Sequence, residues 1–541
     1  MALNNIFIFD SLSKLVGFFV ALFAILMVIY SAGFIKSRKI TYYIWFFFTT
    51  IASLGVVFSG NIILIAVFWG FLGLSLFKLI NLYDNEEASK VAKKTFIIIG
   101  ASDGFLLLGL LLYGFLTSGT NLSANTVIIN SKLSFISFML IAVACFAKAG
   151  CMPFHTWIPE TAKSAPIPVV AYLPASLDKL LGIYLLIRIV KDSFFLNDIA
   201  KITLIALGAI TIIFAVMMAL IQHDIKKLLG YHAVSQVGYM VLSIGCASPI
   251  AIAAGLFHMI NNSIYKCCLF LGAGNVEKQT GTTELSKLGG LARFMPITFT
   301  TFIIAALSIS GIPPFNGFVS KWMIYQGIVE FINSLSSLNL KIIVALSLCC
   351  ALVGSGLTLA SFLKVISSVF LGNTKIKAKE ARFSLLFPAI ILASLCIIFG
   401  VFAYSTIIKF IEKAVGNFSM IGLWQPIGAT ALIVIGIIIG LIVFKLSSMN
   451  LRVSPTYTGG EDLNPQEEAK LEDFYGTISE IPLLKKIYWL AEQKAFDIYE
   501  QLRKAAFALS NLLKKLHNGV LPTYLAWCLL AMIGLFYIFF K

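Results

Sequence analysis

Charged residues are scarce in this chain of 541 residues: Asp, Glu, Lys and Arg make up 12% of the sequence, against 59% hydrophobic residues. Soluble domains usually carry about 25% charged residues. The scarcity of charge therefore excludes a soluble protein and indicates a polytopic membrane protein.

The sequence also lacks motifs for catalysis, metal binding or phosphate binding. It contains no Gly-rich phosphate loop, no catalytic triad and no cluster of metal ligands. The nine cysteines lie almost entirely in apolar segments, without the spacing of a disulfide framework, a zinc site or an iron–sulfur site. We therefore expect neither a metal nor another cofactor in this chain.

Long apolar runs fill most of the sequence. A helix needs about 20 mainly apolar residues to cross a bilayer, and this criterion predicts fourteen helices here. The predicted ranges are approximately 14–35, 41–58, 61–80, 94–117, 133–151, 167–190, 197–222, 228–247, 249–275, 294–333 with an interruption, 340–372, 383–413, 420–447 and 520–540.

The net charge of +16 comes from loops. If the N-terminus is outside, the loops that follow the odd-numbered helices are cytoplasmic, and cytoplasmic loops of membrane proteins are rich in Lys and Arg. This rule explains the basic balance without nucleic acid. The basic residues of these loops are Lys36, Arg38, Lys39, Lys90, Lys93, Lys226, Lys227, Lys287, Arg293, Lys375, Lys377, Lys379 and Arg382.

Two membrane segments contain helix breakers beside a lysine. An apolar run that ends at Lys148 is followed by Pro153, Pro166 and Pro168, and a run near 298–330 is interrupted by Pro313 and Pro314 before Lys321. A charge in hydrocarbon costs several kcal/mol unless it faces a partner or water. Broken membrane helices line ion or substrate sites, and two of them at corresponding places indicate an inverted repeat.

Other polar residues lie between or beside these breaks. His258, Asn262 and Lys266 are four residues apart and therefore share one helix face. Asp178 and Lys179 lie in the helix that follows the first break. Because burial lowers the pKa of a lysine, a row of such lysines joined by histidine can pass protons near neutral pH.

The residues around Lys148 form a family pattern: a membrane lysine, then Pro-Phe-His-x-Trp-hydrophobic-Pro, then Ala-Pro-x-Pro-Val. In these residues the chain resembles the antiporter-like membrane subunits shared by respiratory complex I, Mrp-type sodium/proton antiporters and membrane-bound energy-converting hydrogenases. The hydrogenase branch is nearest, because the other members usually have a histidine at Pro174. The matching residues are Lys148, Pro153, Phe154, His155, Trp157, Ile158, Pro159, Ala165, Pro166, Pro168 and Val169.

The resemblance implies an all-α fold with two half-channels and a proton or ion relay along its middle. The implied relay residues are Lys148, Lys179, His258, Lys266 and Lys321, with Asp103 as an additional candidate and with Asp178, Asn262 and Asp224 as supporting residues. It also implies that the chain begins at the third helix of the family fold.

The chain departs from the family pattern at two positions. Family members usually carry a glutamate after Trp69, where this chain has Gly70, and Asp103 in the next helix is the candidate substitute. The lysine at position 179 stands one residue before the usual position, now Leu180. Since neighbouring helical residues point about 100° apart, the role of Lys179 is open.

The organisation expected from this pattern has six parts. The stretch 451–518 is polar and then amphipathic with an approximate helical period, and the resemblance implies a cytoplasmic lateral helix there. The parts are N-terminal helices at 1–60, a first half-channel at 61–190 with a break near 148–168, a second half-channel at 191–372 with a break near 311–317, additional helices at 373–450, the segment 451–518, and a terminal anchor at 519–541.

The function implied is that of an H⁺- or Na⁺-translocating subunit of a redox-driven respiratory or hydrogenase complex in the cell (inner) membrane. Its partners would be other membrane subunits, lipid, and peripheral electron-transfer subunits that hold iron–sulfur clusters and, in a hydrogenase, a NiFe centre. Any redox chemistry would belong to those subunits. Two alternatives stay open: an Mrp-type cation/proton antiporter subunit, and a structural scaffold that no longer conducts because position 70 lacks its glutamate.

Overall fold

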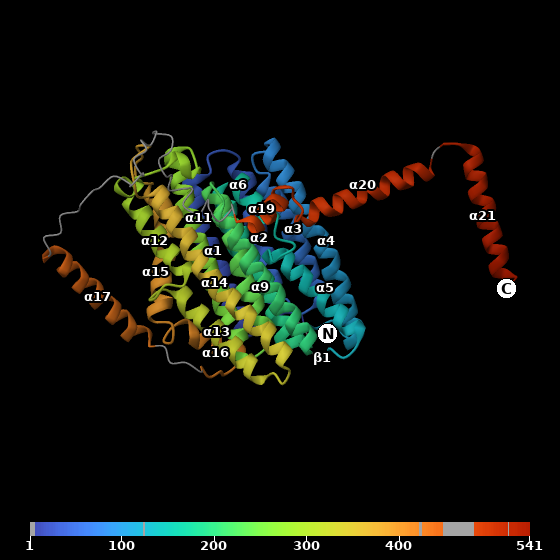
Figure 1. Ribbon diagram of the computed structural model, residues 1–541, viewed down its shortest axis with the longest axis horizontal. Helices are drawn as coiled ribbons and strands as arrows, with labels where there is room; N and C mark the ends of the chain where they lie inside the picture. Colours follow the sequence, from blue (N-terminus) through green and yellow to red (C-terminus); the bar gives the residue numbers. More distant parts are fainter. Residues whose placement is uncertain (1–5, 123–124, 421–424, 447–480, 518, 541) are drawn as a thin grey trace. The chain divides into compact units, whose positions relative to one another are not determined.

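A computed structural model describes residues 6–122, 125–420, 425–446, 481–517 and 519–540. The chain forms two compact units, residues 1–484 and 485–541. Helices make up nearly all of the regular structure in the described residues (Figure 1). The predicted all-α class is confirmed.

The first unit is a bundle of long helices. Its first part runs from α1 (Ser11–Phe34) through α2 (Lys39–Phe58), α3 (Ile62–Ile80), α4 (Glu86–Thr117) and α5 (Lys132–Ala149) to α6 (Trp157–Ser164), α7 (Ile167–Tyr172) and α8 (Asp178–Arg188). The chain continues with α9 (Asp198–Leu220), α10 (Ile225–Gly245), α11 (Pro249–Thr280), α12 (Pro296–Ser310), α13 (Asn316–Ser334), α14 (Leu338–Val369), α15 (Phe383–Val401), α16 (Ile407–Val415) and α17 (Pro426–Leu446).

Shorter elements connect these helices. Wide π-helical turns follow α7 at Leu173–Leu177 and α8 at Ile189–Ser193, and 3₁₀ turns occur at Leu285–Lys287 and Leu291–Arg293. The strands β1 (Val127–Ile128) and β2 (Phe194–Phe195) pair in parallel, with Val127 opposite Phe194. This small sheet ties the α4–α5 connection to the chain before α9.

Short polar side chains begin many of the helices. The side chain of Asn85 accepts a hydrogen bond from the Ala88 backbone at 2.7 Å, and Asn197 accepts one from Ala200 at 2.9 Å. Such caps satisfy backbone N–H groups that have no partner within the helix. The positions at which helices begin therefore follow from Asn, Asp and Ser residues that stand just before the apolar runs.

Eleven helices of the described residues are long and apolar enough to cross a membrane. All but one of the predicted ranges have a helical counterpart close to their predicted bounds. The range 383–413 is the exception, because it contains two helices, α15 and α16. The hydroxyls of Ser405 and Thr406 both donate to the Phe402 carbonyl, at 3.1 and 2.6 Å, and short polar side chains compete in this way with helix continuation.

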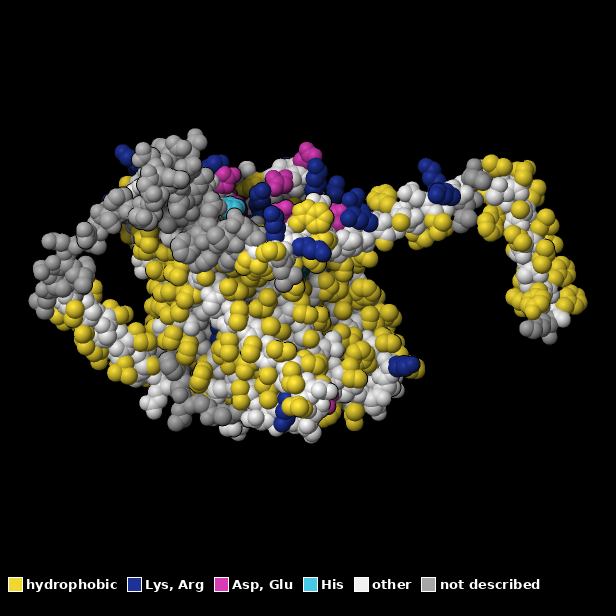
Figure 2. Space-filling model, viewed as in Figure 1, with side chains coloured by type: hydrophobic (Ala, Val, Ile, Leu, Met, Phe, Trp, Pro, Cys, Tyr) yellow, Lys and Arg dark blue, Asp and Glu magenta, His cyan; other side chains and the backbone are white. Residues whose placement is uncertain are grey.

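The surface of the first unit separates apolar and charged residues. On the face that it draws, Figure 2 shows a broad hydrophobic belt across the bundle and a concentration of Lys, Arg, Asp and Glu at the end where α6 lies. Two ion pairs belong to this charged end: Lys94 with Glu160 at 2.7 Å, and Lys226 with Glu277 at 2.8 Å. The belt is the surface expected of a membrane protein.

The second unit contains most of α19 (Pro482–Glu492), then α20 (Ile498–Leu516) and α21 (Leu521–Phe539). The expected single lateral helix is therefore wrong in one respect: the described part consists of two helices. The chain turns at Lys494, whose φ of 56° is left-handed, and Asp497 then caps α20 by accepting from the Tyr499 backbone at 3.1 Å. Residues 451–480 of the predicted cytoplasmic segment lie outside the described residues.

Candidate functional site

The first broken helix turns immediately after Lys148. Helix α5 ends at Ala149, and Gly150 adopts a left-handed conformation with φ of 89°. A cis peptide bond joins Met152 to Pro153, and α6 starts four residues later. The Trp157 indole N–H donates to the Ala147 carbonyl at 3.0 Å, so α6 is fixed against the end of α5.

Pro166 and Pro168 do not break a helix, which corrects the prediction. Pro166 precedes α7 and Pro168 lies in its first turn. Proline is tolerated there because the first-turn N–H groups have no partner within the helix. The first break is therefore shorter than 148–168 and lies between α5 and α6.

Lys148 is buried, with 1% of its surface exposed. Its ammonium nitrogen lies 5.4 Å from the centre of the Trp69 ring on α3. It makes no hydrogen bond with any residue that the structure describes. Asp103 and Asp178 both lie near enough for their carboxylates to attract it.

Asp103 lies on the side of α4 that faces α3. Its Oδ2 atom is 3.2 Å from the place where a Cβ at Gly73 would be, so the missing side chain of Gly73 makes room for the carboxylate. Position 70 is different. Gly70 is exposed, and a Cβ there would meet no described atom within 4 Å. The Asp103 carboxylate thus lies beside α3, in the region of Lys148.

The Lys179 ammonium lies beside the first break. Helix α8 packs closely on α5, because a Cβ at Gly182 would lie 2.9 Å from the Ala149 nitrogen. One turn earlier on α8, the Lys179 ammonium lies 3.7 Å from the place where a Cβ at Gly150 would be. Lys179 and Asp178 are buried, and the π-helical turn just before them sets the direction in which they point.

The second broken helix repeats this arrangement. Helix α12 ends at Ser310, Gly311 is left-handed with φ of 80°, and α13 begins at Asn316. Pro313 and Pro314, joined by a cis peptide bond, occupy the turn as predicted. The Lys321 ammonium lies 3.6 Å from the place of a Cβ at Gly311, as Lys179 lies beside Gly150. In each of the two breaks, the ammonium of a buried lysine lies beside a left-handed glycine. This similarity supports the inverted repeat.

Lys321 and His258 form one buried group. The Lys321 ammonium donates to the Ile309 carbonyl at 2.9 Å and lies 4.8 Å from the Tyr239 ring centre. His258 bonds to Ser320 through Nδ1 at 2.9 Å and to Gln236 through Nε2 at 3.1 Å. The predicted histidine of α11 therefore contacts the residue before the predicted lysine of α13.

Asn261, which the sequence pattern did not select, connects α11 to the second break. Its amide donates to the Asn316 carbonyl at 2.9 Å, and the Asn316 amide donates back to Asn261 Oδ1 at 2.9 Å. The selected residue, Asn262, is fully buried, and neither end of its amide bonds to a described residue. Asn262 therefore lies in the row between His258 and Lys266 with free hydrogen-bonding capacity.

Lys266 completes the row along α11. Its ammonium donates to the Leu229 carbonyl on α10 at 3.0 Å and lies 5.7 Å from the Phe362 ring centre on α14. Asp224 has a different position from the other predicted residues. It caps α10, accepting from the Lys227 backbone at 2.9 Å and from the Thr283 hydroxyl, and these are the contacts of a helix cap at the charged end.

His232 is a buried titratable residue that the motif comparison did not select. It lies on α10 with no exposed surface. A signal was present in the sequence, because His232 and Gln236 are four residues apart in a membrane helix, the same spacing that drew attention to His258 and Asn262.

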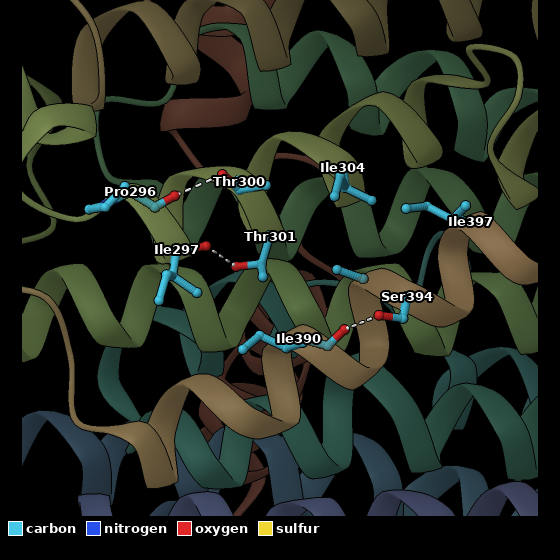
Figure 3. A pocket seen from close by; sticks show the side chains of 9 residues that line it. Pro296, Ile297, Thr300, Thr301, Ile304, Ile390, Ser394 and Ile397 are labelled. Carbon is cyan, nitrogen blue, oxygen red and sulfur yellow. Dashed lines mark hydrogen bonds between the residues drawn. The ribbon is translucent and has the colours of Figure 1, made fainter. Parts of the chain in front are cut away.

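A groove between α12 and α15 does not belong to this row. Figure 3 shows its hydroxyl groups bonded to their own helices: Thr300 to the Pro296 carbonyl at 2.8 Å and Ser394 to the Ile390 carbonyl at 2.9 Å. Thr301 likewise donates to the Ile297 carbonyl at 3.1 Å, and the remaining lining residues are apolar. The groove offers hydrocarbon contact and no ion ligand.

The family follows from comparison with known proteins. The family model described as NADH:quinone oxidoreductase/Mrp antiporter, TM, matches residues 59–349, more than half of the chain. The chain belongs to this family. All of the predicted relay residues lie within the matched range.

Members of the family with known names include sodium/proton antiporter subunits. The A1 subunit of the Na(+)/H(+) antiporter of Staphylococcus haemolyticus is 34% identical over 427 residues, 73% of this chain and 52% of the relative. The corresponding Na(+)/H(+) antiporter subunit of Alkalihalophilus pseudofirmus is 30% identical over 442 residues, 76% of this chain and 54% of the relative. The chain thus spans about half the length of these curated relatives.

Two solved structures share the fold. One is the Mrp complex from Dietzia sp. DQ12-45-1b, with a TM-score of 0.76 and 24% identity over 98% of this chain and 55% of that chain. The other is the membrane-bound sulfane sulfur reductase, an archaeal respiratory membrane complex, with a TM-score of 0.80 and 24% identity over 98% of this chain and 88% of that chain. The antiporter-like, polytopic, all-helical architecture is therefore that of this chain.

Proposed function

We propose that this chain is an H⁺- or Na⁺-translocating subunit of a multisubunit membrane complex, and that protons move along its buried lysines and histidines. The observation that carries the proposal is the burial of Lys148, Lys179, Lys266 and Lys321, each at most 2% exposed, at or between two broken helices. Buried ammonium groups are costly in a membrane and are kept where they serve transport.

The scaffold alternative loses support from the same geometry. A chain that has ceased to conduct has no need of buried charge, yet Lys148 remains, and Asp103 lies in the room that Gly73 leaves beside α3. A carboxylate near Lys148 favours its charged form. Asp103 thus supplies from α4 the charge that the family pattern places at position 70.

The driving reaction has two candidates. The sequence pattern around Pro174 favours a redox-driven, hydrogenase-type complex with electron-transfer subunits as partners. The names of the relatives favour an Mrp-type complex, in which sodium and protons exchange without redox chemistry. Purification of the native complex and identification of its subunits distinguishes them, because only the redox-driven complex contains iron–sulfur subunits.

The lysines are tested by transport. Lys148→Ala, Lys266→Ala and Lys321→Ala should each assemble, as seen on a native gel, but reduce coupled ion uptake into vesicles about tenfold or more. Lys132→Ala, at an exposed lysine that begins α5, is the matched control and should transport like the parent. Normal uptake in all three buried-lysine variants would refute the proposal.

The amphipathic helix α20 is proposed to lie along the cytoplasmic membrane surface. It combines Arg503, Lys504, Lys514 and Lys515 with exposed apolar side chains such as Phe507. Basic amphipathic helices bind the interface through apolar burial and attraction to anionic lipid. Its 19 residues reach about 29 Å.

A further inference from the structure

His232 is held at one ring nitrogen only. Its Nε2 lies 2.8 Å from the Ser361 hydroxyl on α14, and its ring packs on Phe362 with 4.8 Å between the ring centres. Nδ1 is buried and makes no hydrogen bond with any described residue. A ring fixed in this way has one nitrogen from which it can accept and release a proton.

Lys266 approaches His232 from one side. The Leu229 carbonyl that accepts from the Lys266 ammonium lies three residues before His232, so both are on one face of α10. The Phe362 ring that packs on His232 is also the ring 5.7 Å from the Lys266 ammonium. The two titratable groups thus share the same apolar wall.

Hydrogen bonds connect the neighbourhood of His232 to Lys321, the other lysine of the second half. Gln236, one turn later on α10, bonds through Oε1 to His258, and its amide nitrogen is buried without a described partner. His258 contacts Ser320, the neighbour of Lys321. The ammonium groups of both Lys266 and Lys321 act electrostatically on the His232 ring.

We propose that His232 is a proton carrier that joins Lys266 to the group formed by His258 and Lys321. Nδ1 of the neutral ring takes a proton from the Lys266 ammonium, which leaves a neutral amine and an imidazolium. The imidazolium then releases that proton from Nδ1 toward His258, and the ring returns to its neutral form. This inference rests on the proposed function, since it specifies the route of the proton between two of its lysines.

The test uses a side chain that keeps the contact but cannot carry a proton. In the assembled complex, His232→Gln retains a group able to bond to Ser361, and we expect coupled uptake to fall about tenfold or more. The matched control is His223→Gln, at an exposed histidine in the turn before α10, which should transport like the parent. Ser361→Ala keeps the imidazole and removes its anchor, so uptake should fall less, and its pH profile should shift.

The outcomes separate this inference from the proposed function. If Lys266→Ala and Lys321→Ala lose uptake while His232→Gln transports like the parent, the carrier role is wrong and the lysine relay stands. If all three transport like the parent, the proposed function fails. If neither His232→Gln nor His232→Asn assembles, or if Ser361→Ala is as impaired as His232→Gln with an unshifted pH profile, His232 has a packing role and the inference is overturned.

Discussion

At the scale of single residues, the glutamate that is missing at position 70 has a candidate substitute in Asp103 on α4. Asp103 fits beside α3 because Gly73 has no side chain, and its charge reaches the Lys148 ammonium. The sequence identified Asp103 as the only candidate inside its helix, but the space left by Gly73 could not be foreseen, because that space depends on the packing of α3 against α4.

Asp103→Asn should therefore impair coupled ion uptake about as much as Lys148→Ala. The double variant should be little worse than either single variant, because residues of one network have non-additive effects. Uptake into vesicles that contain the assembled complex measures this. Normal uptake in Asp103→Asn would show that the first half-channel works without this carboxylate.

Asp10 gives a residue-scale prediction outside the membrane spans. Arg188 donates to both carboxylate oxygens of Asp10, at 2.5 and 2.6 Å. Burial opposes ionisation of Asp10, but the hydrogen bonds from Arg188 and the Ser13 backbone outweigh it and lower its pKa from 3.8 to about 2. A lowered pKa adds stability above the ordinary pKa, and this stability is lost as the pH falls toward 2.

Asp10→Asn should lower the thermal stability of the purified complex at pH 7, since Asn can still cap α1 but carries no charge. The difference from the parent should shrink as the pH falls from about 4 to about 2. Thermal unfolding at several pH values measures it, with Asp198→Asn, an exposed carboxylate at the start of α9, as control. An unchanged difference across that range would assign the effect to something other than the ion pair.

At the scale of elements, the two breaks were predictable and their extents were not. Glycine and proline beside a lysine indicated both positions. Pro166 and Pro168 looked like part of the first break, because proline interrupts helix interiors but also begins helices, and only the position of α7 decides between the two. The spacing of His232 and Gln236 was a signal in the sequence, but the contact of His232 with Ser361 on α14 depends on packing that no local pattern contains.

Gly150→Ala should destabilise the complex more than Gly311→Ala. Both positions are left-handed, which costs a residue with a side chain about 1–2 kcal/mol. A Cβ at Gly150 would also lie 1.9 Å from Ile158 Cδ1, whereas at Gly311 it would lie 3.0 Å from the flexible Lys321 side chain. Thermal unfolding gives the comparison, and Gly356→Ala, where a Cβ meets no described atom within 4 Å, is the control.

Adding Ile158→Ala to Gly150→Ala should recover part of the lost stability by removing the close contact. Equal stability of the two single glycine variants would contradict the packing argument.

At the scale of the whole molecule, the orientation rests on loop charge. Loops rich in Lys and Arg are usually cytoplasmic. This rule predicts that α20 lies in the cytoplasm and that residue 130, before α5, lies outside the cell. A cysteine introduced as Ser510→Cys should resist a membrane-impermeant thiol reagent in intact cells, and Asn130→Cys should react. The parent measures the background, since Cys349 and Cys528 are exposed in the structure. Labelling of Ser510→Cys from outside would reverse the assignment.

The span Ile167–Ser193 has a consequence for how the protein is made. Among the candidate spans of the described residues, it is the one whose apolar stretch is wholly buried inside the protein. Its mean hydropathy of 1.5 is the lowest of the eleven. It carries Asp178, Lys179 and Arg188, and a charge near a helix centre adds about 2.5–3.5 kcal/mol to the free energy of insertion. During synthesis it leaves the ribosome before α10 and α11, which pack on it in the finished chain. Lipid alone should hold it poorly, so a nascent chain that stops near residue 195 should lose this segment from the bilayer on alkaline extraction, whereas one that extends past α11 should keep it.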